Sequence, residues 1–195
     1  MEENQRKTLL DPDEKEGLIP DIQTQEELNE QEQNNIIEAE QWLFPTCRSV
    51  VRVLTSKFLR TLHEKMFGYV WKWAGQFRKT EKNLGIDPRR ISVECRKLCD
   101  KAGYWLENDT YKHLEFCARI HHRLTMIHPF PNGNGRFARL YVDYLSHCRD
   151  QSRFSWGKND LIENSEIREQ YITSLRKADQ GNIQPLMDFM ESGET

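Results

Sequence analysis

One short stretch of the chain concentrates residue types that could hold and transfer a phosphate group. It reads HPFPNGNGR from His128 to Arg136, and Arg139 follows one helical turn later. Its prolines and glycines predict a tight turn between two helices. The first N–H groups of the second helix have no partner within the helix and carry the positive end of its dipole, so glycines there let an anion approach closely. Arg136 and Arg139 share one helix face and match phosphate geometry, which predicts a polyphosphate site.

His128 is expected at the end of the preceding helix, beside this phosphate site. An imidazole titrates near neutral pH, so it can accept a proton from a hydroxyl group. A histidine next to a polyphosphate therefore indicates attack of a hydroxyl on phosphorus. Phe130 is expected to anchor the turn in the core. A helical corner with a core histidine and two solvated arginines is the alternative, and it explains the whole set of residues less well.

The segments that must position this stretch read as helices. Thr24 followed by Glu27 is the pattern of a capping box, and the apolar stripe behind it ends before Pro45. Ser92 can cap a further helix. After the first helix, the expected helices span residues 49–67, 92–107, 112–128, 133–147, 164–179 and 184–191. Together they predict a mostly α fold, a bundle of helices.

Residues 82–91 break the helical pattern. Gly85 and the pair Asp87-Pro88 are turn residues with apolar neighbours on both sides. A short β-hairpin or an extended flap fits this pattern best. Residues 1–23, which contain further breakers, are expected to be an irregular lead-in.

The charge is distributed unevenly along the 195 residues. Residues 1–45 carry 13 acidic side chains against 3 basic ones, and residues 46–195 carry 18 against 25. We therefore expect an acidic N-terminal arm over residues 1–45 and a catalytic domain over residues 46–195. A mildly basic body suits an anionic ligand such as a nucleotide. No dense basic stripe or nucleic-acid motif is present, so direct nucleic-acid binding is not expected.

Composition also bears on the membrane and on the redox compartment. No apolar run approaches the roughly 20 residues that span a bilayer, and the N-terminus lacks an apolar signal region. Five cysteines at irregular spacing disfavour a disulfide framework and indicate the reduced thiols of a cytoplasmic protein. Cys95 with Cys99, and His113 with Cys117, would share helical faces. Without a CxxC pair, zinc is a minor alternative.

The stretch HPFPNGNGRFAR resembles the Fic signature, HxFx(D/E)GNGRxxR. LHEKMFGYVWKWAGQFRKTEKNLGI (residues 62–86) and ADQGNIQPLMDFM (residues 178–190) also resemble Fic proteins, so the resemblance covers residues 49–191. DPDEKEGLIP and ELNEQEQNNI are similar to the Fic subgroup called mobile mystery protein B. The resemblance implies a helical protein adenylyltransferase that moves AMP from ATP to a Ser, Thr or Tyr hydroxyl of a target protein.

Carried over by position, the resemblance implies a role for each residue of the turn. His128 is the general base, and Arg136 and Arg139 hold the β- and γ-phosphates. The anion hole falls on Gly133, Asn134 and Gly135. The acidic residue of the family, which holds Mg²⁺ or Mn²⁺ against the phosphates, falls on Asn132. An asparagine oxygen can bind a hard cation, but without the negative charge that such a cation favours.

The resemblance also places residues around the nucleotide. The flap, which lies over the nucleotide and pairs with the backbone of the target, falls on Leu84, Gly85, Ile86 and Asp87. The adenine side falls on Tyr171 and Asp179.

Many Fic proteins carry an inhibitory helix with the pattern (S/T)xxxE(G/N), whose glutamate pairs with the second motif arginine, here Arg139. No stretch of this chain matches the pattern in full. Partial matches lie at Glu16-Gly17, at Glu27-Leu28-Asn29 and in residues 165–170. We favour Glu27 as the inhibitory residue, although the capping box competes for its carboxylate.

The asparagine at position 132 leaves other functions open. They are transfer of another nucleotide or of a phosphate, removal of AMP, and a nucleotide-binding regulatory module with little catalysis. The retained His128 argues against the last, because binding alone needs no base. A homo-oligomer and a neighbouring DNA-binding regulatory partner also stay open, and no membrane partner is expected.

Overall fold

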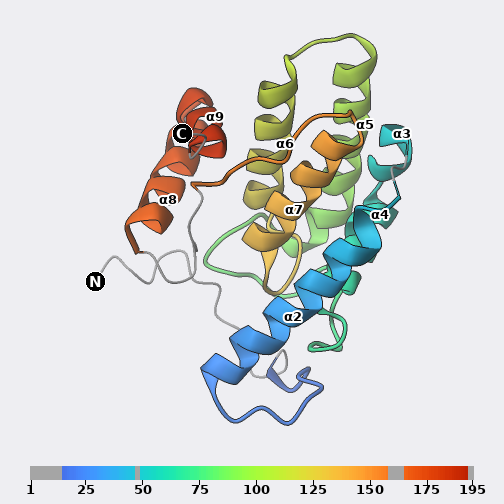
Figure 1. Cartoon of the computed structure of the whole chain (residues 1–195), viewed down its shortest axis with the longest axis vertical. Coiled ribbons are helices and arrows are strands. Elements are labelled where there is room, and N and C mark those ends of the chain that lie inside the picture. The colour runs from blue at the N-terminus through green and yellow to red at the C-terminus, as the bar shows by residue number, and fades with distance from the viewer. Residues whose placement is uncertain (1–14, 47–48, 158–164, 193–195) are drawn as a thin grey trace.

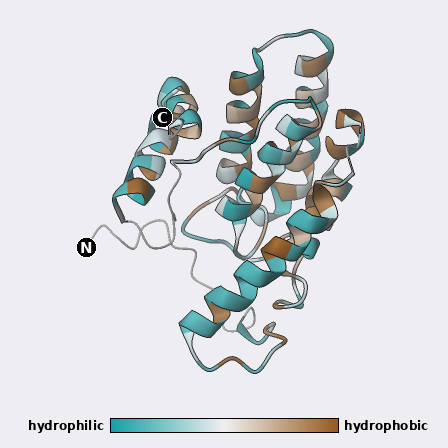
Figure 2. Ribbon diagram, viewed as in Figure 1, coloured by the Kyte–Doolittle hydropathy of each residue, from teal (hydrophilic) through white to brown (hydrophobic). Residues whose placement is uncertain are grey.

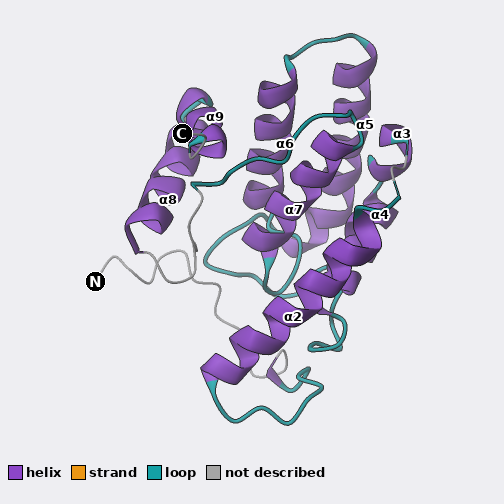
Figure 3. Ribbon diagram, in the orientation of Figure 1, coloured by secondary structure: helices purple, strands orange, loops and turns teal. Residues whose placement is uncertain are grey.

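The computed structural model describes residues 15–46, 49–157 and 165–192, and helices dominate these ranges (Figures 1 and 3). In chain order they are α2 (Gln25–Leu43), α3 (Val50–Val53), α4 (Ser56–Phe67), the 3₁₀ helix η1 (Pro88–Arg90), α5 (Ile91–Glu107), α6 (His113–Ile127), α7 (Asn134–His147), α8 (Ser165–Asp179) and α9 (Gln184–Glu191). Within the described ranges, extended pairing is limited to one isolated bridge between Leu18 and Trp71. The expectation of a mostly α fold is confirmed.

The α6–α7 pair lies at the centre of the bundle. α6 packs against α5 on one side and α7 on the other, α2 lies along α4, and the pair α8–α9 contacts α6 (Figure 1). Most side chains of α7 are buried, and the largest fully buried side chains include Phe137, Tyr141 and Tyr144 of this helix. The turn between α6 and α7 therefore leads into a helix whose side chains are mostly buried and closely packed.

The sequence predicts how helix α2 begins, but it does not predict the contacts by which α2 packs against the rest of the domain. The expected capping box is present: the Thr24 hydroxyl accepts from the Glu27 N–H, and the Glu27 carboxylate accepts from the Thr24 N–H, both at 3.1 Å. Farther along, the Asn35 amide donates to the Lys65 carbonyl and accepts from the Tyr69 N–H. The first half of α2 is hydrophilic almost throughout (Figure 2), and its second half shares the common core.

The single helix expected over residues 49–67 is wrong, because the chain breaks between α3 and α4. Leu54 leaves the helical conformation, with φ −79° and ψ 55°. Thr55 is extended, and its hydroxyl accepts from the Phe58 N–H at 3.1 Å. A threonine hydroxyl that caps a new helix competes with continuation of the old one.

Ser92 does not cap α5, because the helical turn starts earlier. Asp87 accepts from the Arg89 N–H at 2.9 Å, and Pro88 occupies the first position of η1, which leads directly into α5. Proline has the right φ for a first helical residue and needs no N–H partner there. Residues 82–87 form an irregular loop and not the expected hairpin. We call this loop the flap.

The cysteines give no sign of a metal site. Cys95, Cys99 and Cys117 are buried, and burial raises the pKa of Cys95 and Cys99 to about 12. In the described residues, no group of three or more His, Cys, Asp or Glu side chains could hold a metal ion. Cys47 lies outside the described residues.

No helix in the described ranges is both long and apolar enough to cross a bilayer.

Candidate active site

A tight reversal joins the end of α6 to the start of α7, as the sequence predicts. His128 follows α6 in the left-handed conformation, with φ 52°, and Gly133 opens α7 with φ 75°. A Cβ at position 133 would lie 2.5 Å from the Phe67 ring, so only glycine allows this approach. Backbone of this kind persists where the surroundings enforce it, often at functional sites.

Asn134 holds the turn closed from inside. Its amide accepts from the Phe130 N–H at 2.9 Å and donates to the Phe130 carbonyl at 2.8 Å. Asn134 is 3% exposed and Phe130 is fully buried, as expected for an anchor of the turn. The Asn134 side chain therefore shapes the turn, and its contribution to an anion site would come from its backbone N–H.

His63 supports the same turn, and the sequence analysis did not identify it. It lies among the apolar residues of α4, and its ring stacks on Phe130 with centroids 3.7 Å apart. Its Nδ1 accepts from the Gly75 N–H at 3.0 Å, which leaves the proton on Nε2 to donate to the Asn132 carbonyl at 3.1 Å. Burial lowers the pKa of His63 to about 3, so the ring is neutral. The sequence does contain one indication of this role, because His63 is the polar residue on the otherwise apolar buried face of α4.

The His128 imidazole is set up to accept a proton. His128 is 7% exposed, and its pKa is lowered to about 4, first by burial and then by the positive charge of Arg78. A hydrogen bond to the Thr125 backbone opposes this shift and occupies one ring nitrogen as a donor. The other nitrogen is therefore an acceptor in the neutral ring that prevails at pH 7.

The two motif arginines have different partners. Arg136 donates to the Glu32 carboxylate at 2.6 Å, and its guanidinium lies 5.0 Å from the centroid of the Phe67 ring. The Arg139 guanidinium lies 5.6 Å from the Tyr171 ring centroid, and burial lowers its pKa.

Gly135 leaves space beside Arg139 and Tyr171. A Cβ on Gly135 would lie 3.7 Å from Arg139 Nη1 and 4.0 Å from the Tyr171 hydroxyl. The first turn of α7, Arg139 and Tyr171 thus come together around one position where an anion can bind.

Asn132 offers at most one oxygen to a cation. Its Oδ1 accepts from the Gly133 N–H at 2.7 Å. The oxygen expected to bind the cation therefore accepts a hydrogen bond from the Gly133 N–H, which is one of the N–H groups expected to bind the anion. A neutral oxygen fits Mg²⁺ only as a single, weak protein ligand, with phosphate oxygens supplying the remainder.

The flap approaches His128 closely at Gly85. Gly85 has φ 100°, and a Cβ there would lie 2.6 Å from the His128 Cβ. The Ile86 N–H donates to the Ile127 carbonyl at 3.4 Å. Leu84 precedes this contact, and the Asp87 carboxylate turns away to cap η1 and pair with Arg89.

Asp179 lies at the far end of α8 from the expected phosphate site. Its carboxylate lies 2.9 Å from Nε2 of His122, a residue of α6, and the Asp179 side chain is exposed to solvent. Tyr171, by contrast, bonds to His121 at 2.9 Å beside Arg139. The structure thus brings Tyr171 to the motif arginines and leaves Asp179 beside α6.

The structure does not bring Glu27 to either motif arginine, because its carboxylate caps α2 and is exposed. The acid of α2 that reaches the motif is Glu32, which the sequence analysis did not identify. Glu32 is 4% exposed, and its other oxygen accepts from the Trp71 indole N–H at 2.6 Å.

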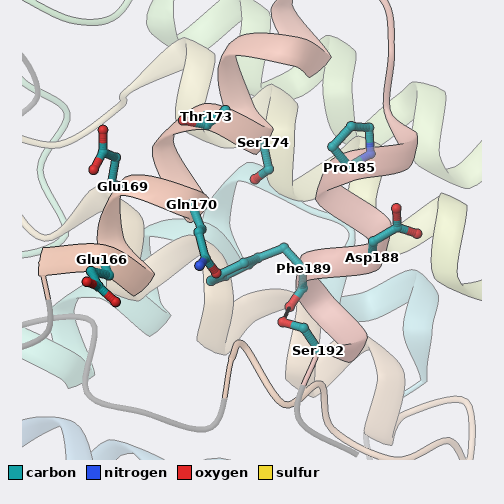
Figure 4. A pocket seen from close by; sticks show the side chains of 9 residues that line it. All are labelled: Glu166, Glu169, Gln170, Thr173, Ser174, Pro185, Asp188, Phe189 and Ser192. Atoms are coloured by element: carbon teal, nitrogen blue, oxygen red, sulfur yellow. Dashed lines mark hydrogen bonds between the residues drawn. The ribbon is translucent and has the colours of Figure 1, made fainter.

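A groove of about 590 Å³ lies between α8 and α9, outside this turn (Figure 4). Phe189 lies within it, and the carboxylates of Glu166, Glu169 and Asp188 are on its rim. This acidic rim is unsuited to a polyphosphate.

A buried histidine, the N-terminus of α7 and two arginines meet at one turn of this helical domain. Such an arrangement can hold a phosphate group beside a proton acceptor. Residues 53–146 match the family model of the Fic/DOC family.

Two curated relatives are similar in sequence. The protein adenylyltransferase Fic of Drosophila grimshawi is 28% identical over 141 residues, which cover 70% of this chain and 28% of the fly protein. The corresponding adenylyltransferase of Caenorhabditis elegans is 27% identical over 124 residues, which cover 60% of this chain and 22% of the worm protein. This chain therefore spans about a quarter of the length of these relatives.

Solved structures show the same fold. The BepC protein of Bartonella tribocorum, crystallised with bound AMPPNP, has a TM-score of 0.66 at 20% identity and covers 91% of this chain and 95% of that one. A Fic domain containing signaling protein of Bacteroides thetaiotaomicron has a TM-score of 0.63 at 20% identity, with 85% and 67% covered. At this identity the likeness concerns the fold alone.

Proposed function

We propose that this chain is a protein adenylyltransferase, which transfers AMP from ATP to a Ser, Thr or Tyr hydroxyl of a target protein. The observation that carries the proposal is the neutral, buried His128 beside the N-terminus of α7 and its two arginines. A module that only binds a nucleotide has no need of a base at this place. The names of the curated relatives support the same reaction.

His128 performs the proton transfer in this mechanism. The imidazole accepts the proton of the acceptor hydroxyl as its oxygen forms a bond to the α-phosphorus of ATP. The bond from the α-phosphorus to the bridging oxygen breaks, and pyrophosphate leaves. The N–H groups at the start of α7, with Arg136 and Arg139, stabilise the negative charge on the phosphates, which is the main contribution in phosphoryl-type transfer.

A divalent cation fits this site as a companion of ATP. Asn132 would be its protein ligand through Oδ1, once that oxygen is released from the Gly133 N–H. When bound, Mg²⁺ or Mn²⁺ neutralises charge on the phosphates. Because Asn132 contributes no charge, we expect it to bind the cation more weakly than an acidic ligand would.

We propose in addition that α2 restrains the site, through Glu32 and not through Glu27. Arg136 cannot turn fully to a phosphate while it donates to the Glu32 carboxylate at 2.6 Å. Glu32 is itself held by the Trp71 indole. The wild-type chain should therefore be slow until α2 shifts or Glu32 is replaced.

Finer assignments follow from the sequence resemblance. DPDEKEGLIP and ELNEQEQNNI support membership of the mobile mystery protein B subgroup, and the cysteine content supports a cytoplasmic location. A neighbouring DNA-binding regulatory partner is a prediction of the subgroup resemblance, and a homo-oligomer stays an open alternative.

The test is the intact mass of the chain after incubation with Mg²⁺ or Mn²⁺ and, separately, ATP, GTP, CTP and UTP. An added AMP in wild type that is absent from His128→Ala supports the proposal. An added mass only with another nucleotide, or an added phosphate, would favour the other transfer reactions. Nucleotide binding with no added mass to the chain or to lysate proteins would favour a regulatory module.

A further inference from the structure

Arg78 is a buried arginine that holds two segments of the chain together. It is 3% exposed. Its Nε donates to the His128 carbonyl at 2.7 Å and its Nη1 to the Thr80 carbonyl at 2.8 Å, while Nη2 donates to the Ile86 carbonyl. The backbone N–H of Arg78 donates to the Pro129 carbonyl at 2.9 Å. One residue therefore connects the flap to the turn that carries the base.

The end of α6 explains why a cation is useful there. The last carbonyl groups of a helix lack partners inside the helix, and the negative end of the dipole attracts a positive charge. His128 follows this end in the left-handed conformation, which costs free energy for a residue other than glycine. The guanidinium of Arg78 bonds to the His128 carbonyl and lies 3.5 Å from the Ile127 carbonyl. Arg78 thus stabilises the backbone conformation that orients the imidazole.

The flap depends on the same guanidinium. A Cβ at Gly85 would lie 2.5 Å from Arg78 Nη2 and 2.6 Å from the His128 Cβ. The flap can lie this close to both side chains only because position 85 is glycine. Gly85, Arg78 and His128 therefore form one packed unit.

The positive charges near His128 help to keep its imidazole neutral. Burial is the largest cause that lowers the pKa of His128, and the positive charges of Arg78 and Lys82 lower it further. The hydrogen bond to the Thr125 backbone acts in the opposite direction. The ring is neutral as a result, as a proton acceptor must be.

We propose that Arg78 is a positioning residue for the transfer reaction, which holds His128 and the flap in one fixed arrangement so that an acceptor hydroxyl lying along the flap meets the imidazole. This role rests on the proposed function and concerns the acceptor side of the same site. The nucleotide phosphates are held by groups of α7. Loss of Arg78 should therefore slow transfer by much more than it weakens ATP binding, whereas a merely structural arginine would change only the folded fraction.

The experiment compares Arg78→Lys and Arg78→Gln with wild type in the full chain. Arg60→Lys is the matched control, because Arg60 Nε donates to the Gly75 carbonyl at 2.8 Å in the neighbouring turn without touching His128. Four quantities are measured: the melting temperature, the Kd for ATP with Mg²⁺, the rate of AMP incorporation, and the pKa of His128. The last comes from NMR of labelled histidines, with His128→Ala identifying the signal.

Both Arg78 variants should incorporate AMP about 10- to 100-fold more slowly, the effect of misplacing a reacting group by about 1 Å. Well below the melting temperature, their Kd for ATP should change much less than the rate does, and Arg60→Lys should resemble wild type throughout. The pKa of His128 should rise in Arg78→Gln and change less in Arg78→Lys, which keeps the charge.

A rate that falls only in proportion to ATP affinity or to the folded fraction would overturn this role. So would a normal rate. Failure of both the wild-type and the Glu32→Gln chain to incorporate AMP would refute the proposed function instead, and the NMR comparison would still decide on Arg78. An unchanged shift and pKa of His128 in Arg78→Gln would then overturn it.

Discussion

Replacing Glu32 by glutamine should release Arg136 for the nucleotide while keeping an amide oxygen for the Trp71 indole. In wild type the Glu32 carboxylate accepts from Arg136 and from Trp71, each at 2.6 Å. A hydrogen bond between charged groups stabilises by about 1.5–3 kcal/mol. ATP must displace the hydrogen bond between Arg136 and Glu32 before Arg136 can bind a phosphate fully. Replacing Glu32 by glutamine removes the charge from this bond, so ATP should bind about 10- to 100-fold more tightly, at about 1.4 kcal/mol for each factor of ten.

Calorimetric titration with ATP and Mg²⁺ measures this change, and AMP incorporation should rise in parallel. Glu27→Gln is the matched control on the same helix. The Glu27 carboxylate accepts from the backbone N–H groups of Gln23 and Thr24, and glutamine also serves in a capping box. Equal affinity in wild type and Glu32→Gln, or an equal gain in Glu27→Gln, would refute the reasoning.

Three further outcomes follow from the geometry. Gly133→Ala should lower the free energy of unfolding by about 1–3 kcal/mol, measured with urea, because its Cβ would meet the Phe67 ring 2.5 Å away at a positive φ. Burial raises the pKa of Asp143 to about 6, so the folded chain binds this proton more tightly than the unfolded chain. Stability should then fall as the pH rises from about 4 to about 7, and Asp143→Asn, which keeps an oxygen for the Trp156 indole, should flatten that slope in urea unfolding. The pKa of His128 is about 4, so the rate of AMP transfer should lose its dependence on this group above that value and fall as the pH drops through it. A pH–rate profile with a midpoint near 6.5 would contradict this.

Local patterns predicted the parts of the fold and site that depend on neighbouring residues. The capping box of Thr24 and Glu27, the turn after His128 and the buried anchor Phe130 are all set within a few positions of the chain. Each has a specific local cause, namely a side-chain cap, a glycine at positive φ or an apolar residue in a tight turn. The break before Thr55 was missed because an apolar stripe continues across it.

Long-range polar contacts could not be predicted from the sequence. Glu32 meets Arg136 across 104 positions, His63 meets the Asn132 carbonyl across 69, and Arg78 meets the His128 carbonyl across 50. Periodicity places such residues on a helix face but does not say which distant backbone group each one reaches. A local pattern also favoured Glu27, whose carboxylate is used within its own helix turn.

The most direct test of the central claim uses the Glu32→Gln chain with ATP and Mg²⁺, beside the same chain carrying His128→Ala. Peptide mass spectrometry then locates any added group. The account predicts AMP on a Ser, Thr or Tyr hydroxyl of the first chain, or of a protein mixed with it, and none with the second. AMP transfer that persists without His128, or a transferred phosphate in place of AMP, would contradict it.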